Sequence, residues 1–148
     1  MRPSLEDTIA LAAKAHVGQV DKGGAPYILH PLRVMLAVDA DETARMVAVL
    51  HDVVEDTSVT LEQLYFLGYS SLVVMAVDHL SRRPRMGYDE YIERLCAGPP
   101  VALHVKLADL LDNMDRSRIP NPTERDQQRW AKYTDTWHRI HRAFRSAW

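Results

Sequence analysis

The sequence predicts an all-α, single-domain helical bundle that spans the whole chain, residues 1–148. Two observations favour this fold class. Apolar residues recur at helical spacing between N-cap residues and Gly or Pro breaks, and no stretch shows a convincing strand-like alternation. There is also no repeat, low-complexity tract or linker that would divide the chain. A chain of 148 residues suits one compact domain with a substantial core.

The expected helices follow from their caps and breaks. Ser4 with Asp7 three residues later predicts a capping box at the first helix. Pro31 suits the first turn of the second helix, and Asp41 is expected to cap the third, which would run on through Asp56. Counted from their caps, the predicted helices cover residues 4–15, 31–38, 41–56, 60–68, 70–80, 88–96, 101–116 and 123–148.

Composition restricts the partners and the compartment. The net charge of −2 gives no reason to expect binding to nucleic acid or to an anionic membrane. Cys96 is the one cysteine, which excludes an internal disulfide and a Cys-rich zinc site and fits a reducing cytoplasm. The N-terminus lacks an apolar signal core, so we expect a cytoplasmic protein. An oligomer contact through the C-terminal helix, with Trp130, Trp137 and Trp148, is an open expectation.

Residues 51–56 form the most unusual segment, because they place one imidazole and three carboxylates next to an apolar run. On a helix, His51, Asp52, Glu55 and Asp56 lie at rotations of roughly 0°, 100°, 40° and 140°, so all four share one side. The chain has no Lys or Arg between Arg45 and Arg82 to neutralise them locally. A divalent metal would account for both the acid cluster and the adjacent histidine.

Two further groups of residues extend this cluster. Lys106, Asp109 and Asn113 share a helix face, where they suit a ligand, although a Lys106–Asp109 pair would be as reasonable. His30 precedes a predicted helix start, where a lone histidine is more often structural. Two imidazoles and two carboxylates together suit Mn²⁺, Fe²⁺ or Zn²⁺ better than Mg²⁺ or Ca²⁺. The set is His30, His51, Asp52 and Asp109.

These residues carry a family resemblance. The order His…His-Asp…Asp is the signature of the HD metal-dependent phosphohydrolases. The segments 15–19, 22–31, 50–57 and 105–113 together resemble the hydrolase domain of the RelA/SpoT family. The resemblance implies an HD-type helical bundle and an enzyme of the stringent response that removes the 3′-pyrophosphate of (p)ppGpp, giving GDP or GTP. Because the chain is short, we expect a stand-alone small alarmone hydrolase.

The resemblance also implies roles for single residues. It implies one Mn²⁺ per chain, with Fe²⁺ or Zn²⁺ as alternatives, held by His30, His51, Asp52 and Asp109. Glu55 and Asp56 would orient or deprotonate the attacking water, although a distant Arg could instead pair with Glu55. The expected substrate-binding residues are Lys22 and Asn113 by resemblance, and Lys106 and Arg83 by their position. A solvated basic loop is an alternative for Arg83 and for Lys22.

One position departs from the family pattern and leaves the substrate open. The family usually has an Arg before the lysine, where this chain has Asp21. An anion at this place would weaken a stacking contact with guanine or change the base preference. Three alternatives therefore remain: an alarmone hydrolase, a phosphohydrolase of another nucleotide or of a cofactor such as NADPH, and a non-catalytic nucleotide-binding HD domain. The intact Glu55 and Asp56 argue against the last.

Overall fold

The computed structural model describes residues 1–38 and 40–147, and it confirms the all-α prediction. Within these residues the only β-type pairing is an isolated bridge between Val20 and Pro26. The helices and the one 3₁₀ turn, η1, have the following bounds: α1 Leu5–Ala15, α2 Leu29–Ala37, α3 Glu42–Leu50, α4 Val53–Asp56, α5 Leu61–Phe66, α6 Ser71–Leu80, α7 Tyr88–Cys96, α8 Pro100–Asn113, η1 Arg116–Arg118 and α9 Glu124–Ser146.

The helix starts follow the capping signals of the sequence. Ser4, Thr60 and Thr123 each form a capping box with the side chain three residues later. The side chains of Asp41 and Ser70 also accept backbone N–H groups at the starts of α3 and α6. These caps satisfy amides that have no partner within the helix, which fixes where each helix begins.

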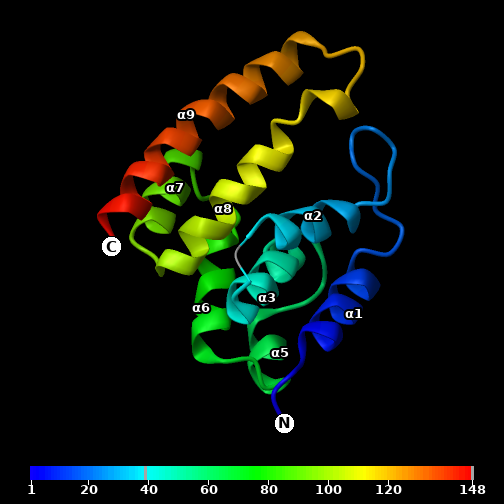
Figure 1. Cartoon of the computed structure of the whole chain (residues 1–148), viewed down its shortest axis with the longest axis vertical. Helices are drawn as coiled ribbons and strands as arrows, with labels where there is room; N and C mark the ends of the chain where they lie inside the picture. Colours follow the sequence, from blue (N-terminus) through cyan, green and yellow to red (C-terminus); the bar gives the residue numbers. More distant parts are fainter. Residues whose placement is uncertain (39, 148) are drawn as a thin grey trace.

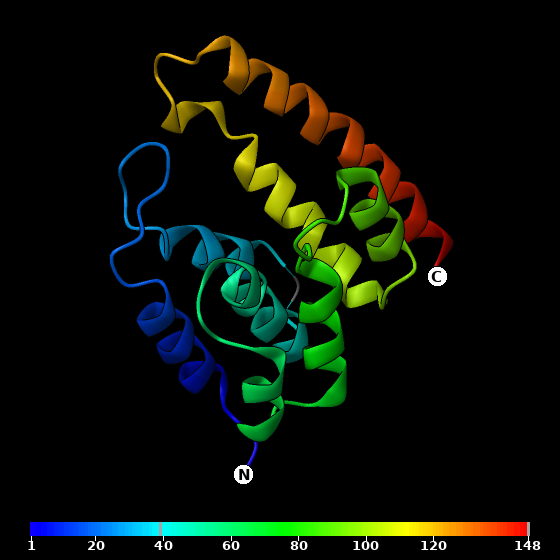
Figure 2. The same ribbon diagram turned by 180° about the vertical axis from the view of Figure 1, so that it is seen from behind.

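Helix α3 lies at the centre of the bundle and contacts α1, α2, α6 and α8. Its segment Val47–Leu50 is completely buried, as expected for a helix that is surrounded on several sides. Helix α9 runs along α8 on the outside of the bundle (Figures 1 and 2). The loop between α1 and α2 lies near the C-terminal end of α8. Elements distant in sequence thus meet around α3 and α8.

The structure corrects two details of the prediction. The helix expected to run unbroken to Asp56 instead ends at Leu50, and a turn at His51 and Asp52 separates it from the short α4. His30 lies inside the first turn of α2 rather than before its start. Hydrophobic periodicity detects neither feature, because a turn within an apolar run leaves the pattern of buried residues nearly unchanged.

The C-terminal helix packs its tryptophans inward. Trp130 is buried, and its indole N–H donates to the carbonyl of Asn113 at the end of α8. Trp137 packs against the core and stacks on His141. Trp148 lies outside the described residues. The oligomer contact proposed for this helix stays a prediction, and these contacts assign Trp130 and Trp137 to packing within the chain.

Candidate metal centre and substrate pocket

Four side chains from two helices and a turn bring their donor atoms together. Nε2 of His30 lies 3.3 Å from Nε2 of His51 and 2.9 Å from Oδ1 of Asp109. Nε2 of His51 lies 3.3 Å from the same Asp109 oxygen and 3.0 Å from Oδ2 of Asp52. His30 comes from α2, Asp109 from α8, and the other two from the turn between α3 and α4. We call these four residues the donor cluster.

Hydrogen bonds on the far side of each ring orient the two imidazoles. Nδ1 of His51 lies 2.6 Å from the carbonyl oxygen of Ala48, and Nδ1 of His30 lies 2.6 Å from Oδ2 of Asp112. Arg33 in turn holds Asp112 through contacts of 2.8 and 3.1 Å. Because carbonyl and carboxylate oxygens only accept, each Nδ1 carries a hydrogen, and in the neutral ring Nε2 is left as an electron-pair donor.

This arrangement fits a metal ion. In their neutral forms, His30 and His51 direct two lone pairs at each other across 3.3 Å, next to carboxylate oxygens. Such a group of donors repels itself unless a proton or a metal ion lies among them. Burial opposes protonation of the two rings, but the neighbouring carboxylates raise the pKa of both, so a cation is favoured at this place. Nitrogen and carboxylate donors backed by outer hydrogen bonds are typical of transition-metal sites. The donor cluster could therefore hold one divalent ion.

Two neighbours on α8 bind Asp109 of the donor cluster. Lys106 Nζ lies 2.7 Å from Oδ2 of Asp109, and the Asn113 amide donates to Oδ1 at 2.9 Å. Burial alone would raise the pKa of Asp109, but Lys106 and the imidazoles hold that pKa well below its usual range. The structure thus places Lys106 and Asn113, expected from the sequence to bind substrate, directly on this carboxylate, where they keep it ionised.

A second group of carboxylates lies beside the cluster. Oxygens of Asp52, Glu55 and Asp56 lie within 4.8 Å of one another. The Tyr27 hydroxyl donates to Oδ2 of Asp52, and Oε1 of Glu55 accepts the backbone N–H of Arg82 at 2.6 Å. Burial raises the pKa of Glu55 and of Asp56, and the neighbouring carboxylates raise both further. Carboxyl groups with raised pKa values are better proton acceptors than ordinary surface carboxylates.

The loop of residues 81–87 borders the acid group on one side. Arg83 lies in this loop, is more than half exposed and forms a 3.4 Å ion pair with Asp78. The loop and Glu55 line the same open depression. Arg83 does not contact the donor cluster, so the structure leaves its guanidinium available for a group bound at the mouth of the site.

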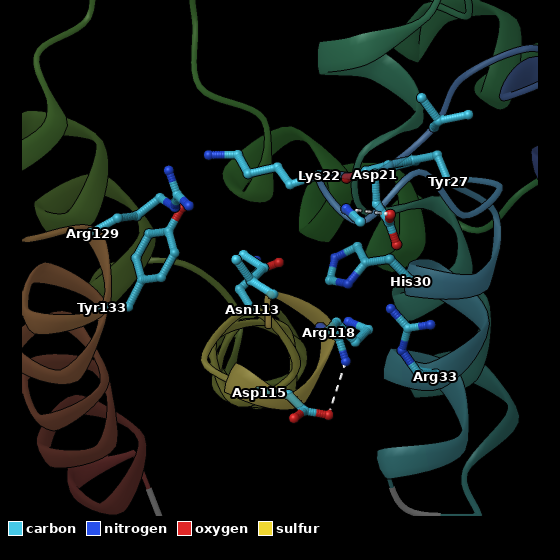
Figure 3. Close-up of a pocket in the computed structure, with 13 residues that line it drawn as sticks. Asp21, Lys22, Tyr27, His30, Arg33, Asn113, Asp115, Arg118, Arg129 and Tyr133 are labelled. Atoms are coloured by element: carbon cyan, nitrogen blue, oxygen red, sulfur yellow. Dashed lines mark hydrogen bonds and ion pairs between the residues drawn. The ribbon is translucent and has the colours of Figure 1, made fainter. Parts of the chain in front are cut away.

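A cavity of about 350 Å³ adjoins His30 on the other side. In Figure 3, Lys22 from the loop after α1 and Arg129 from α9 point toward each other across it, with Tyr133 beside Arg129. Burial and the nearby charge of Arg129 lower the pKa of Lys22. Two cations that converge on one space favour an anionic ligand there. The lining also includes Tyr27, Arg33, Asn113, Asp115 and Arg118.

Asp21 shapes the loop that carries Lys22. Its Oδ1 accepts the backbone N–H groups of Gly23 and Ala25, each at 2.9 Å. The loop passes close to η1, because a Cβ added at Gly23 would lie 2.9 Å from the carbonyl oxygen of Arg118. The carboxylate therefore builds the rim of the cavity, a role that an Arg at the same position could not fill.

A solved structure shares this fold, and curated proteins match part of the sequence. A solved metazoan SpoT orthologue, described as hydrolysing ppGpp and acting in starvation responses, is 28% identical, with a TM-score of 0.75. The match covers 99% of this chain and 98% of that one. The chain resembles the hydrolase domain of the RelA/SpoT family. No protein-family model matches it.

Longer members of the RelA/SpoT family match as well. A GTP pyrophosphokinase of Streptomyces coelicolor is 33% identical over 77% of this chain, and the bifunctional SpoT of Escherichia coli is 34% identical over 74%. A guanosine-3′,5′-bis(diphosphate) 3′-pyrophosphohydrolase of Vibrio cholerae is 34% identical over 57%. The chain spans only 15%, 17% and 12% of these three proteins, respectively.

Several residues around this RelA/SpoT-like site had no role in the sequence analysis. Asp112, which bonds His30, and Arg33, which bonds Asp112, each lie three residues from a cluster member, so helical spacing could have indicated them. Tyr27 lies three residues before His30. Arg129 and Tyr133 reach the cavity only because α9 folds back along α8, which no local pattern predicts.

Among the described helices, none has the length and apolar character needed to cross a membrane.

Proposed function

We propose that this protein is a metal-dependent hydrolase that removes the 3′-pyrophosphate of (p)ppGpp-type nucleotides, leaving GDP or GTP and pyrophosphate. The observation that carries the proposal is the convergence of four donor groups beside two carboxylates with raised pKa values. The metazoan SpoT orthologue, matched over nearly its full length, supports the choice of substrate class.

His30, His51, Asp52 and Asp109 would hold the ion, for which we propose Mn²⁺ from the mixed nitrogen and oxygen donors. When bound, such a metal supplies Lewis-acid chemistry, polarising phosphate oxygens and acidifying water. Lys106 and Asn113 keep the Asp109 carboxylate ionised and correctly oriented. Their proposed contribution to substrate binding is then indirect, through this carboxylate.

Glu55 and Asp56 act on the attacking water. The bond from Arg82 N–H fixes one oxygen of Glu55, which leaves the other oxygen to accept a proton from water. Asp56 follows on the same short helix and shares the group of carboxylates. Because burial raises both pKa values, either carboxylate accepts a proton more readily than a surface carboxylate.

The two sides of the centre suit the two phosphorylated ends of the substrate. Lys22 and Arg129 face each other across the cavity next to His30, where their charges favour a phosphate group. Arg83 lies on the opposite side, in the loop beyond Glu55. A substrate held from both sides would present its phosphoester bond to the acid group between them.

We propose the cytoplasm as the compartment, since the single cysteine cannot form an internal disulfide.

Product analysis tests the proposal. The protein is incubated with Mn²⁺ and ppGpp, pppGpp, the adenine analogue of ppGpp or NADPH, and the released phosphate species are identified. We expect pyrophosphate from the two guanosine nucleotides. Orthophosphate from NADPH alone would instead support the alternative phosphohydrolase, which Asp21 motivates because no cation stands at that position. Binding without any product would support the non-catalytic alternative.

A further inference from the structure

His16 is a buried histidine that the proposed mechanism does not use. It caps the C-terminus of α1 and is only 2% exposed. Its ring packs against that of Tyr27, with 5.1 Å between the centroids, and Tyr27 in turn bonds Asp52 of the donor cluster. His16 therefore lies one side chain away from the donor cluster, and its hydrogen bond and its ring contact are with Gln19 and Tyr27.

The hydrogen bonds of Gln19 define the protonation of this ring. Gln19 Nε2 donates to the backbone carbonyl of Asp56 at 2.9 Å, so its Oε1 is the end that meets His16. The distance from that oxygen to His16 Nδ1 is 2.7 Å. An amide oxygen only accepts, so Nδ1 carries the hydrogen. In the neutral ring, Nε2 is consequently an acceptor.

That acceptor is buried without a partner. Among the residues that the structure describes, no hydrogen-bond donor reaches His16 Nε2. Buried polar atoms nearly always have a partner, and where the protein supplies none, ordered water or a ligand usually does. The surroundings point to the active site, because Gln19 ties this ring to Asp56. Burial and the neighbouring Asp52 raise the pKa of Asp56.

We propose that His16 is a positioning residue whose Nε2 accepts a hydrogen bond from a water molecule next to the Asp56 carboxylate. Its Nδ1–H fixes the Asp56 backbone through Gln19 at the same time. One ring would thus hold both the carboxylate and the water on which it acts. The inference rests on the proposed function, because it assigns Asp56 a role toward the attacking water.

Two substitutions separate the roles of the two ring nitrogens. The amide of Asn stands as many bonds from the backbone as Nδ1, so His16→Asn keeps a donor for Gln19 and loses the Nε2 acceptor. His16→Gln places an amide oxygen at the distance of Nε2 and loses the Nδ1 donor. We expect His16→Asn to lower kcat about tenfold with KM unchanged, and His16→Gln to be closer to the wild type.

Three measurements decide the inference. The first is the steady-state kinetics of the two single variants, and the second is the kinetics of each variant combined with Asp56→Asn. The third is the unfolding midpoint of every variant, which shows whether the fold is kept. A smaller loss from His16→Asn in the Asp56→Asn background than in the wild type supports action through Asp56. If His16→Asn is fully active, or if His16→Gln is the more damaged of the two, the ring only supports Gln19 and the inference fails.

A crystal structure of the metal-loaded protein supplies a readout that needs no activity. We expect an ordered water within hydrogen-bond distance of His16 Nε2 and on the side of Asp56. If the wild type releases no product from any substrate, the proposed function fails while this water still supports the positioning geometry. An Nε2 atom without water in that structure would overturn the inference, whatever the activity.

Discussion

The donor cluster differs from the cationic rim in burial and in the number of bonds that orient each side chain. The rim comprises Lys22, Arg83 and Arg129. The side chains of His30, His51 and Asp109 are at most 5% exposed, and each has a second bond that orients it. The rim residues come from two loops and from α9, and Arg83 is 59% exposed. If the proposed function holds, the difference assigns the chemistry to buried, doubly bonded groups and the choice of substrate to more exposed groups at the rim.

The largest expected effect comes from a break in the donor cluster. Asp109→Asn removes a charged ligand and leaves Lys106 without its partner, so we expect metal affinity to fall by more than about 100-fold and turnover to reach background. Metal titration and product assays measure this. Asp89→Asn, on an exposed carboxylate, is the matched control. Asp109→Asn with wild-type metal content would exclude Asp109 as a ligand.

The next effect separates the proton acceptor from the metal. Glu55→Gln keeps the hydrogen bond to the Arg82 backbone but cannot accept a proton, so we expect the metal to stay and kcat to fall by roughly 10²-fold. Elemental analysis and steady-state kinetics report the two quantities. Glu62→Gln, in the first turn of α5, is the control. An unchanged rate in Glu55→Gln would remove this residue from the mechanism.

The acid limb of the pH profile of kcat tests the same role of Glu55 as a proton acceptor. Burial raises the pKa of Glu55, so its carboxylate becomes protonated at a higher pH than an ordinary glutamate. Because the proposed base acts as the carboxylate, kcat should fall as the pH drops through this raised pKa. We expect Glu55→Gln to lose that limb. The same limb at the same pH in the variant would assign it to another group.

A smaller effect is expected one layer out from the cluster. Asp112→Asn weakens the bond that orients His30 and the contact with Arg33, so we expect metal affinity to fall about 10-fold to 100-fold, which excess metal restores. Titration of the apoprotein measures the change. If affinity is unaffected, the orientation of His30 does not depend on Asp112.

Much of this architecture follows from local sequence, and some of it does not. The caps at Ser4 and Asp41 fix helix starts within a few residues, so the spacing rules succeed there. The apolar pattern does not predict the turn at His51, because the pattern continues through it. The Lys106–Asp109 pair is one of the two alternatives that the helical spacing offers, whereas only the folded chain shows that Asn113 also binds Asp109. Arg129 joins the cavity through tertiary packing alone.

The smallest effects are expected at the rim. Arg83→Ala removes an exposed cation whose one ion pair, to Asp78, is weak, so we expect KM to rise only a few-fold with kcat nearly unchanged. Lys22→Ala, inside the cavity, should raise KM more, because Lys22 faces Arg129 across a partly buried space. Steady-state kinetics with ppGpp compare the two. A large loss of kcat in either variant would contradict the division between centre and rim.

The location of the metal tests the central claim most directly. Crystals grown with Mn²⁺ and measured for anomalous scattering should show one strong peak per chain, bonded to Nε2 of His30 and His51 and to carboxylate oxygens of Asp52 and Asp109. A peak bound instead by Glu55 and Asp56 alone, or no peak at all in the presence of Mn²⁺, would contradict the account.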